Sequence, residues 1–153
     1  RGLRFLVDRA DTGPLLKIKV LNVSKRELLR DLTRAVEFDL SALFRKVYED
    51  EYGVLGGEPY GLLVGDYEFG RSADDVALLK MIGNVAAAAH APFVAAAAPR
   101  LFNLDRFAEL TAPRDLAKMF EGVEYTPWRA FRDTEDARYV ALTLPRVLAR
   151  VPY

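Results

Sequence analysis

Residues 60–99 constrain the fold more than any other part of the chain, because they have the pattern of a strand, a helix and a second strand. The first strand is indicated by a short apolar run at residues 62–64, which is followed by Gly65 and Asp66. Short apolar runs that end at turn residues are typical of strands buried on both faces. We therefore expect the chain to leave the sheet at Gly65 and to form a loop over residues 65–72.

The helix of this unit has a start signal, a periodic apolar face and a stop signal. Ser72 is a suitable N-cap residue, and Asp75 follows it at the capping-box position. Apolar residues then recur at helical spacing, at Val76, Leu79, Ile82, Val85 and Ala89. Pro92 ends the helix, and residues 93–95 resume an apolar strand. A β-α-β unit packs on a parallel sheet, so this stretch predicts one.

The remaining patterns extend the same architecture. Residues 15–23 (LLKIKVLNV) alternate as a strand does, with Lys17 and Lys19 as weak signs of an edge strand. Ser24 and Glu27 form a capping box, Ser41 is a second N-cap, and residues 139–144 (YVALTL) predict a last strand. The sequence predicts an α/β fold: a small, mostly parallel sheet of about four strands flanked by helices, in a single module over residues 1–153.

Composition excludes several classes of function. Lys and Arg number 22, as do Asp and Glu, and this balance argues against nucleic acid or an anionic membrane as a partner. The chain has no cysteine, which excludes disulfides, thiolate zinc sites and cysteine nucleophiles. No apolar run approaches the roughly 20 residues of a membrane span, so we expect no membrane insertion.

Asp66 is the sharpest enzymatic candidate. Placed just past a strand's carboxyl end, it would lie where open α/β sheets hold ligands, and Glu68, Asp74 and Asp75 could join it around Mg²⁺. The alternative is a local role for each acid, at the turn or at the helix N-terminus. The loop at 65–72 (GDYEFGRS) has acids and aromatics where a phosphate cradle needs glycines and a lysine.

His90 is the only histidine, and it follows an alanine run at the predicted helix end. A single histidine cannot build a multi-histidine metal site, so we interpret His90 as a capping or packing residue. The sequence therefore predicts no complete catalytic set, no cofactor and no metal site, and we expect a protein that is not an enzyme. The alternative is a flavodoxin-like or Mg²⁺-dependent α/β enzyme that uses Asp66.

Four blocks of the chain resemble one known family. They are residues 15–28 (LLKIKVLNVSKREL), 51–69 (EYGVLGGEPYGLLVGDYEF), 86–99 (AAAAHAPFVAAAAP) and 124–153 (EYTPWRAFRDTEDARYVALTLPRVLARVPY). Taken in order, they are similar to the large subunit of the type VI secretion system contractile sheath, the TssC/VipB/EvpB family. The resemblance covers essentially the whole chain and implies an internal segment of a longer subunit.

The resemblance implies a structural role in the bacterial cytoplasm. In this family the large subunit pairs with a small sheath subunit of the TssB/VipA family. The pairs then stack as neighbouring protomers around an inner tube of haemolysin-coregulated protein. Contraction propels tube and spike out of the cell, and an AAA+ ATPase dismantles the contracted sheath. The element that this ATPase recognises lies near the subunit's N-terminus in this family, and nothing in this segment matches that element.

Mixed charges near the C-terminal end are candidates for contacts between neighbouring subunits. Opposed surface charges can fix the register of two proteins in an assembly. The candidate residues are Arg129, Arg132, Asp133, Glu135, Asp136 and Arg138. An ordinary solvated face is the alternative for any one of them.

Overall fold

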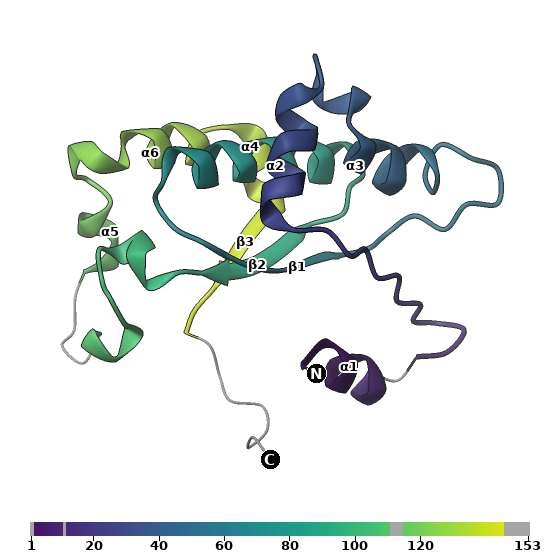
Figure 1. The fold of residues 1–153 in the computed structure, drawn as a ribbon, viewed down its shortest axis with the longest axis horizontal. Coiled ribbons are helices and arrows are strands. Elements are labelled where there is room, and N and C mark those ends of the chain that lie inside the picture. The colour runs from purple at the N-terminus through teal and green to yellow at the C-terminus, as the bar shows by residue number, and fades with distance from the viewer. Residues whose placement is uncertain (1, 11, 111–114, 146–153) are drawn as a thin grey trace.

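The computed structural model describes residues 2–10, 12–110 and 115–145. A three-stranded sheet lies under a layer of helices (Figure 1). The helices and strands, in chain order, are α1 (Gly2–Arg9), α2 (Lys25–Arg34), α3 (Ala42–Phe44), which continues as a π-helical turn (Arg45–Glu49), β1 (Leu63–Phe69), α4 (Ala73–Ala88), β2 (Phe93–Ala97), α5 (Leu116–Met119), α6 (Thr126–Arg132) and β3 (Val140–Thr143). Short 3₁₀ turns cover Phe38–Leu40, Pro99–Phe102, Phe107–Glu109, Val123–Tyr125 and Glu135–Tyr139.

The sheet is entirely parallel, with the strand order β1-β2-β3. Phe93 of β2 is paired with Leu63 of β1 and with Val140 of β3, and the register of β1 against β2 shifts between Val64 and Glu68. Helix α4 makes the crossover from β1 to β2, and Figure 1 shows α2, α4 and α6 on the same side of the sheet. The predicted α/β class and the predicted strands at β2 and β3 are confirmed.

Serine caps determine where the main helices begin. Ser24 Oγ accepts the Glu27 amide and the Glu27 carboxylate accepts the Ser24 amide, so the predicted capping box forms at α2. Ser72 Oγ accepts the Asp75 amide at 3.2 Å and caps α4. Asp75 does not complete a second capping box, because its Oδ2 accepts the backbone N–H of Gly70 instead.

The main core lies between the sheet and the helices. Helix α4 supplies most of it, and Leu79 and Val85 are completely buried. Phe69 of β1 and Phe93 of β2 meet edge to face beneath this helix, with ring centroids 6.2 Å apart. A second cluster, formed around Leu101 and Phe102, continues the core past the end of β2. Within the described ranges no helix combines the length and apolar character needed to cross a bilayer.

The predicted strand at residues 15–23 is wrong. Apart from one isolated bridge between Gly13 and Leu16, these residues form no regular secondary structure and pair with no strand of the described chain. Their apolar side chains are consequently exposed, and they are Leu15, Leu16, Ile18, Val20 and Leu21. The sheet therefore has three strands among the described residues where about four were predicted. The alternating pattern is genuine, but a strand also needs a neighbour for its backbone hydrogen bonds.

The first strand of the sheet also differs from the prediction. The chain does not leave the sheet at Gly65, because β1 runs through Gly65 and Asp66 as far as Phe69. Side chains alternate between the two faces, and only one face is covered: Phe69 is buried, whereas Val64 is 72% exposed. The predicted burial on both faces is therefore wrong for β1 in this structure.

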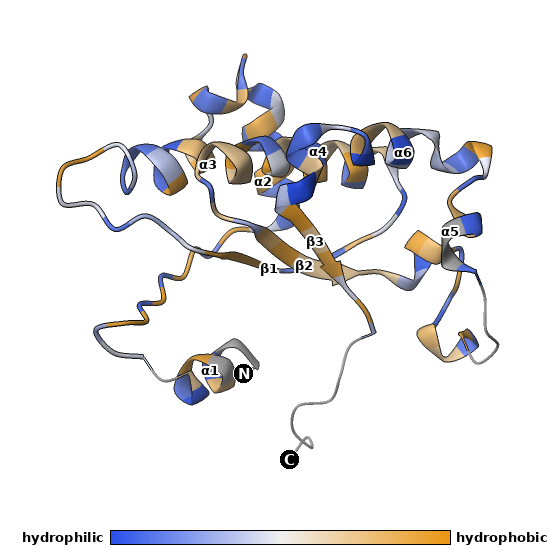
Figure 2. Ribbon diagram, turned by 180° about the vertical axis from the view of Figure 1, so that it is seen from behind, coloured by the Kyte–Doolittle hydropathy of each residue, from blue (hydrophilic) through white to orange (hydrophobic). Residues whose placement is uncertain are grey.

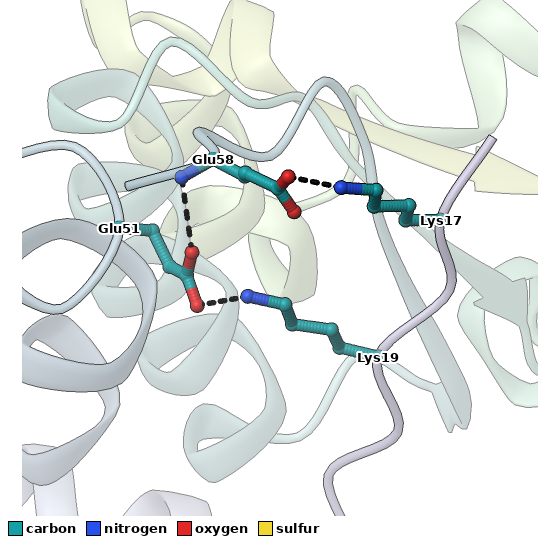
Figure 3. A network of polar contacts seen from close by, with 4 residues as sticks. All are labelled: Lys17, Lys19, Glu51 and Glu58. Carbon is teal, nitrogen blue, oxygen red and sulfur yellow. Dashed lines mark hydrogen bonds and ion pairs between the residues drawn. The ribbon is translucent and has the colours of Figure 1, made fainter. Parts of the chain in front are cut away.

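Two ion pairs attach residues 15–21 to the loop before β1. Lys17 pairs with Glu58, and Lys19 pairs with Glu51 (Figure 3). The Glu51 carboxylate also accepts the backbone N–H of Glu58 at 3.3 Å, so Glu51 contacts both Lys19 and Glu58. The lysines predicted as weak edge signals thus bind acids rather than line a strand edge.

This attachment should depend on pH. The hydrogen bond with Lys19 lowers the pKa of Glu51 below its ordinary 4.5, and the same bond raises the pKa of Lys19 above 10.5. A carboxyl group with a lowered pKa stabilises the folded state at pH values above its ordinary pKa. This contribution disappears as pH falls through the lowered pKa. A lysine with a raised pKa stabilises the folded state at pH values below its ordinary pKa. This contribution is lost as pH rises through the raised pKa. We therefore expect the pair to persist from about pH 5 to about pH 10.

The measurement is a carboxyl-carbon NMR titration of Glu51. In the Lys19→Met variant the Glu51 pKa should rise toward its ordinary value, because the main cause of the shift is gone. A Glu51 pKa that is the same in both proteins would contradict the contact.

Candidate assembly surface

An apolar hollow of about 540 Å³ lies beside β3, between the sheet and α6. Its floor combines Leu142 of β3 and the following Leu144 with Phe120, just after α5, and Trp128 of α6. Trp128 stacks on Phe120 with ring centroids 6.0 Å apart, which gives the floor a fixed shape. Leu144 is more than one third exposed at the open side.

Charged residues surround this hollow. Arg132, Asp133, Glu135 and Arg138 line it and are exposed. Arg138 Nη2 pairs with Glu135 Oε1 at 2.7 Å, and its Nε donates to the Glu135 carbonyl. Exposed pairs of this kind add little to stability, so these charges are available for contacts with another surface. An apolar centre with a charged rim is the usual anatomy of a protein interface.

Two of the six predicted contact residues, Arg129 and Asp136, also bond to groups elsewhere in the fold. Arg129 Nη1 donates to the carbonyls of Phe120 and Gly122, each at 2.8 Å, and thereby holds the turn before α6. With the Asn84 side-chain amide turned so that its nitrogen faces α4's neighbour Asp136, that nitrogen donates to Asp136 Oδ2 at 3.1 Å. The structure therefore brings four of the candidates together on one rim and uses Arg129 and Asp136 within the fold.

Local sequence determines the position of the rim. Thr126 Oγ1 donates to the Val123 carbonyl at 2.7 Å, and Pro127 occupies the first turn of α6. At the other end Thr134 Oγ1 donates to the Phe131 carbonyl at 2.6 Å. These two bonds fix a short helix, and the chain then turns through Glu135–Tyr139 into β3.

Asp66 does not lie at the end of a strand. It is in the middle of β1, exposed, on the face of the sheet that no helix covers. Asp75 lies at the start of α4, on the covered side, where its Oδ1 pairs with Lys25 Nζ at 2.5 Å. The carboxylates predicted to surround Mg²⁺ are therefore separated, and the described residues contain no group of three or more His, Asp or Glu side chains that could hold a metal.

The carboxyl end of β1 carries a structural contact. Lys25 Nζ donates to the Glu68 carbonyl at 2.7 Å and lies 4.4 Å from the centroid of the Phe69 ring, so this lysine joins α2, β1 and α4. The adjacent polar hollow, of about 890 Å³, contains Arg71 and Arg100 together with the carboxylates of Asp75, Asp105, Glu109 and Glu124. Four acids would repel a phosphate there.

His90 follows α4 in the left-handed conformation, with φ of 51°. Its backbone N–H donates to the Ala87 carbonyl, and its Nδ1 lies 3.4 Å from the Tyr139 hydroxyl. Both contacts hold the end of the helix, which agrees with the predicted capping or packing role.

Sequence reasoning found the charges of this surface but missed its apolar floor. Trp128, which forms part of that floor, is half-buried. Leu142 and Leu144 were assigned to the last strand, without any sign that one side of it stays open. One signal for an open side was available in the sequence. Pro145 follows Leu144, and proline in a sheet is confined to edge strands and strand ends.

Comparisons with known proteins identify the family of this chain. The family model described as "EvpB/VC_A0108, tail sheath N-terminal domain" (VipB) matches residues 1–153. A curated relative, the type VI secretion system sheath protein TssC1 of Pseudomonas aeruginosa, is 50% identical over 155 residues. The match covers 100% of this chain and 31% of that relative, so the chain spans about a third of its length. The chain therefore belongs to the VipB family of tail sheath proteins and corresponds to the N-terminal domain of that family.

Proposed function

We propose that this chain is a rigid structural module of the contractile sheath of a type VI secretion system, within the large sheath subunit in the bacterial cytoplasm. The observation that carries the proposal is the family match over residues 1–153, together with 50% identity to a sheath protein along the whole chain. The proposed role is mechanical and involves no catalysis. The separation of Asp66 from the other acids supports this view.

The proposed partners follow from the same role. The subunit would pair with a small sheath subunit and stack with neighbouring protomers around an inner tube of haemolysin-coregulated protein. Contraction would then drive the tube and its spike outward, and an AAA+ ATPase would dismantle the contracted sheath by acting on the full subunit outside this segment. Rigid-body movement of subunits needs a well-packed core, and the continuous cluster under α4 supports it.

Two surfaces are proposed for contacts in the sheath. One is the apolar hollow beside β3 with its rim of Arg132, Asp133, Glu135 and Arg138. The other is segment 15–21, which carries five exposed apolar side chains. Exposed apolar patches rimmed by charge mark protein–protein contacts, and an unpaired extended segment can pair with a strand of another chain.

The test is negative-stain electron microscopy of the full-length subunit, expressed with and without the small sheath subunit. We expect tubules only when both are present. Soluble monomers in every condition, with expression of the partner verified, would overturn the proposal.

Charge reversal on the rim should impair assembly. We expect the double variant Arg132→Glu/Arg138→Glu to reduce the yield of pelletable tubules about tenfold or more, because like charges at a desolvating interface cost several kcal/mol. Both arginines are exposed, so the fold should tolerate the change. Sedimentation of the co-expressed complex measures the yield.

The matched control is Arg26→Glu/Arg30→Glu, which makes the same charge change on the exposed side of α2. Equal yields from the two double variants would contradict a specific role for the rim.

A further inference from the structure

The described residues leave one face of the sheet uncovered, although parallel sheets are normally buried on both faces. The helices α2, α4 and α6 lie on the opposite face (Figure 1), and the strands are among the most hydrophobic parts of the ribbon in Figure 2. The uncovered face consists of alternate residues of the three strands, which are Val64, Asp66, Glu68, Val94, Ala96, Ala141 and Thr143.

Four of these seven residues are apolar. Val64, Val94 and Ala141 form one row across the three strands, because each pairs with the next in register. Val64 is 72% exposed, and Ala141 is also exposed. In the next row the Thr143 hydroxyl donates to the Ala95 carbonyl at 3.2 Å, which satisfies its polar group. Small side chains such as Ala96 and Ala141 allow another layer to approach closely.

The described chain does not supply that layer. Both crossovers, from β1 to β2 and from β2 to β3, move across the sheet in the same direction, and α4 of the first and α6 of the second lie on the same side (Figure 1). Because crossovers have one preferred hand, a helix reaches the other face only when the chain reverses direction across the sheet. If the chain continued after β3 to form a further strand on the outer side of β1, it would have to reverse direction in this way, and the connecting helix would then lie on the uncovered face.

We propose that an α-helix from the remainder of the same polypeptide, outside residues 1–153, covers this face in the full-length subunit. The inference rests on the proposed function in one respect, namely that the chain works within a longer sheath subunit. The curated relative supports that length, since 31% of it matches this chain. The covering helix has small and apolar residues over the Val64–Val94–Ala141 row. It carries a lysine or arginine toward the β1 edge, where Asp66 lies.

The experiment measures thiol accessibility in the full-length subunit. Residues 1–153 contain no cysteine, and any cysteine elsewhere is replaced by serine. Ala141→Cys places a thiol on the uncovered face, and Ala77→Cys places one on the exposed side of α4 as the matched control. Maleimide labelling is followed by mass spectrometry, with and without the small sheath subunit and in denaturant.

We expect Cys labelling of the Ala141→Cys variant to be roughly hundredfold slower in the native subunit than in denaturant, since a buried thiol reacts only through opening of the fold. The rate should be the same with and without the small subunit. The Ala77→Cys variant should label rapidly in every condition. Fast labelling of Ala141→Cys in all conditions, or protection that appears only with the small subunit, overturns the proposal.

A photo-crosslinking residue at Val94 identifies what covers the face, and it remains informative if a cysteine variant fails to fold. We expect crosslinks to a peptide of the same polypeptide outside residues 1–153. In a mixture of isotopically heavy and light subunits, crosslinks that join heavy to light chains would show that a second copy covers the face and overturn the proposal.

Tubule formation is scored separately, so the two hypotheses can fail independently. Protection without tubules contradicts the sheath function alone, and tubules with a reactive Ala141→Cys thiol contradict the covering helix alone.

Discussion

Replacing Leu79 with alanine is expected to lower the free energy of unfolding of the 1–153 polypeptide by about 2–5 kcal/mol. Leu79 lies on the inner side of α4 with 0% of its surface exposed, and it belongs to the main core cluster. Truncation removes its apolar burial and leaves a cavity that the neighbours fill only partly. Domains of this size are stable by about 5–15 kcal/mol, so the loss is a large fraction of the total.

The effect can be measured by urea unfolding followed through tryptophan fluorescence. Trp128 is the only tryptophan of the chain and packs between Phe120 and Phe131, so its emission reports on the folded helical layer. Leu55→Ala is the matched control, because Leu55 lies in the loop before β1 and is fully exposed. We expect that control to change stability by less than about 0.5 kcal/mol. Equal unfolding midpoints for the two variants would contradict the assignment of the core.

Local signals predicted the helices well. Ser24 and Ser72 cap helices where the sequence placed them, and Pro92 separates α4 from β2 as expected. These signals work because each depends on contacts within a few residues, and such contacts form whatever the rest of the chain does. The same locality explains why β2 and β3 were found, since both are apolar runs ended by turns or by proline.

Strand pairing was less predictable because it depends on distant residues. Residues 15–23 have a strand's alternation, yet no strand of the described chain lies beside them. At β1 the dipeptide Gly65-Asp66 has the composition of a turn, but the strand continues through it. No local pattern distinguishes a glycine that ends a strand from one that makes room for a ring on the neighbouring strand.

The candidate site shows the same division. Sequence reasoning identified the segment from Arg129 to Arg138 by its mixed charges. It could not separate Arg129 and Asp136 from the rest, because their partners are the carbonyl of Phe120 and the amide of Asn84, which depend on tertiary packing. The hollow itself combines residues from β2, β3 and α6 and has no counterpart in any single stretch.

Replacing Gly65 with valine is expected to lower the free energy of unfolding by about 3 kcal/mol, the upper end of the usual cost of overpacking. A Cβ at this position would lie 2.6 Å from Phe93 Cζ and 2.9 Å from Tyr67 Cδ2. Neither ring can move away easily. Phe93 is 6% exposed and meets Phe69 edge to face, while the Tyr67 hydroxyl donates to the Val23 carbonyl at 2.6 Å.

The neighbouring glycine provides the control, because a Cβ at Gly61 would meet nothing within 4 Å. Gly61→Ala should be neutral or slightly stabilising, since it restricts only the unfolded chain. A double-mutant cycle then tests the cause directly. If the Phe93 ring is what excludes a side chain at position 65, Phe93→Leu should recover at least about 1 kcal/mol of the loss caused by Gly65→Ala. Additive losses would mean that the ring yields and that the close approach of β1 to β2 does not require glycine.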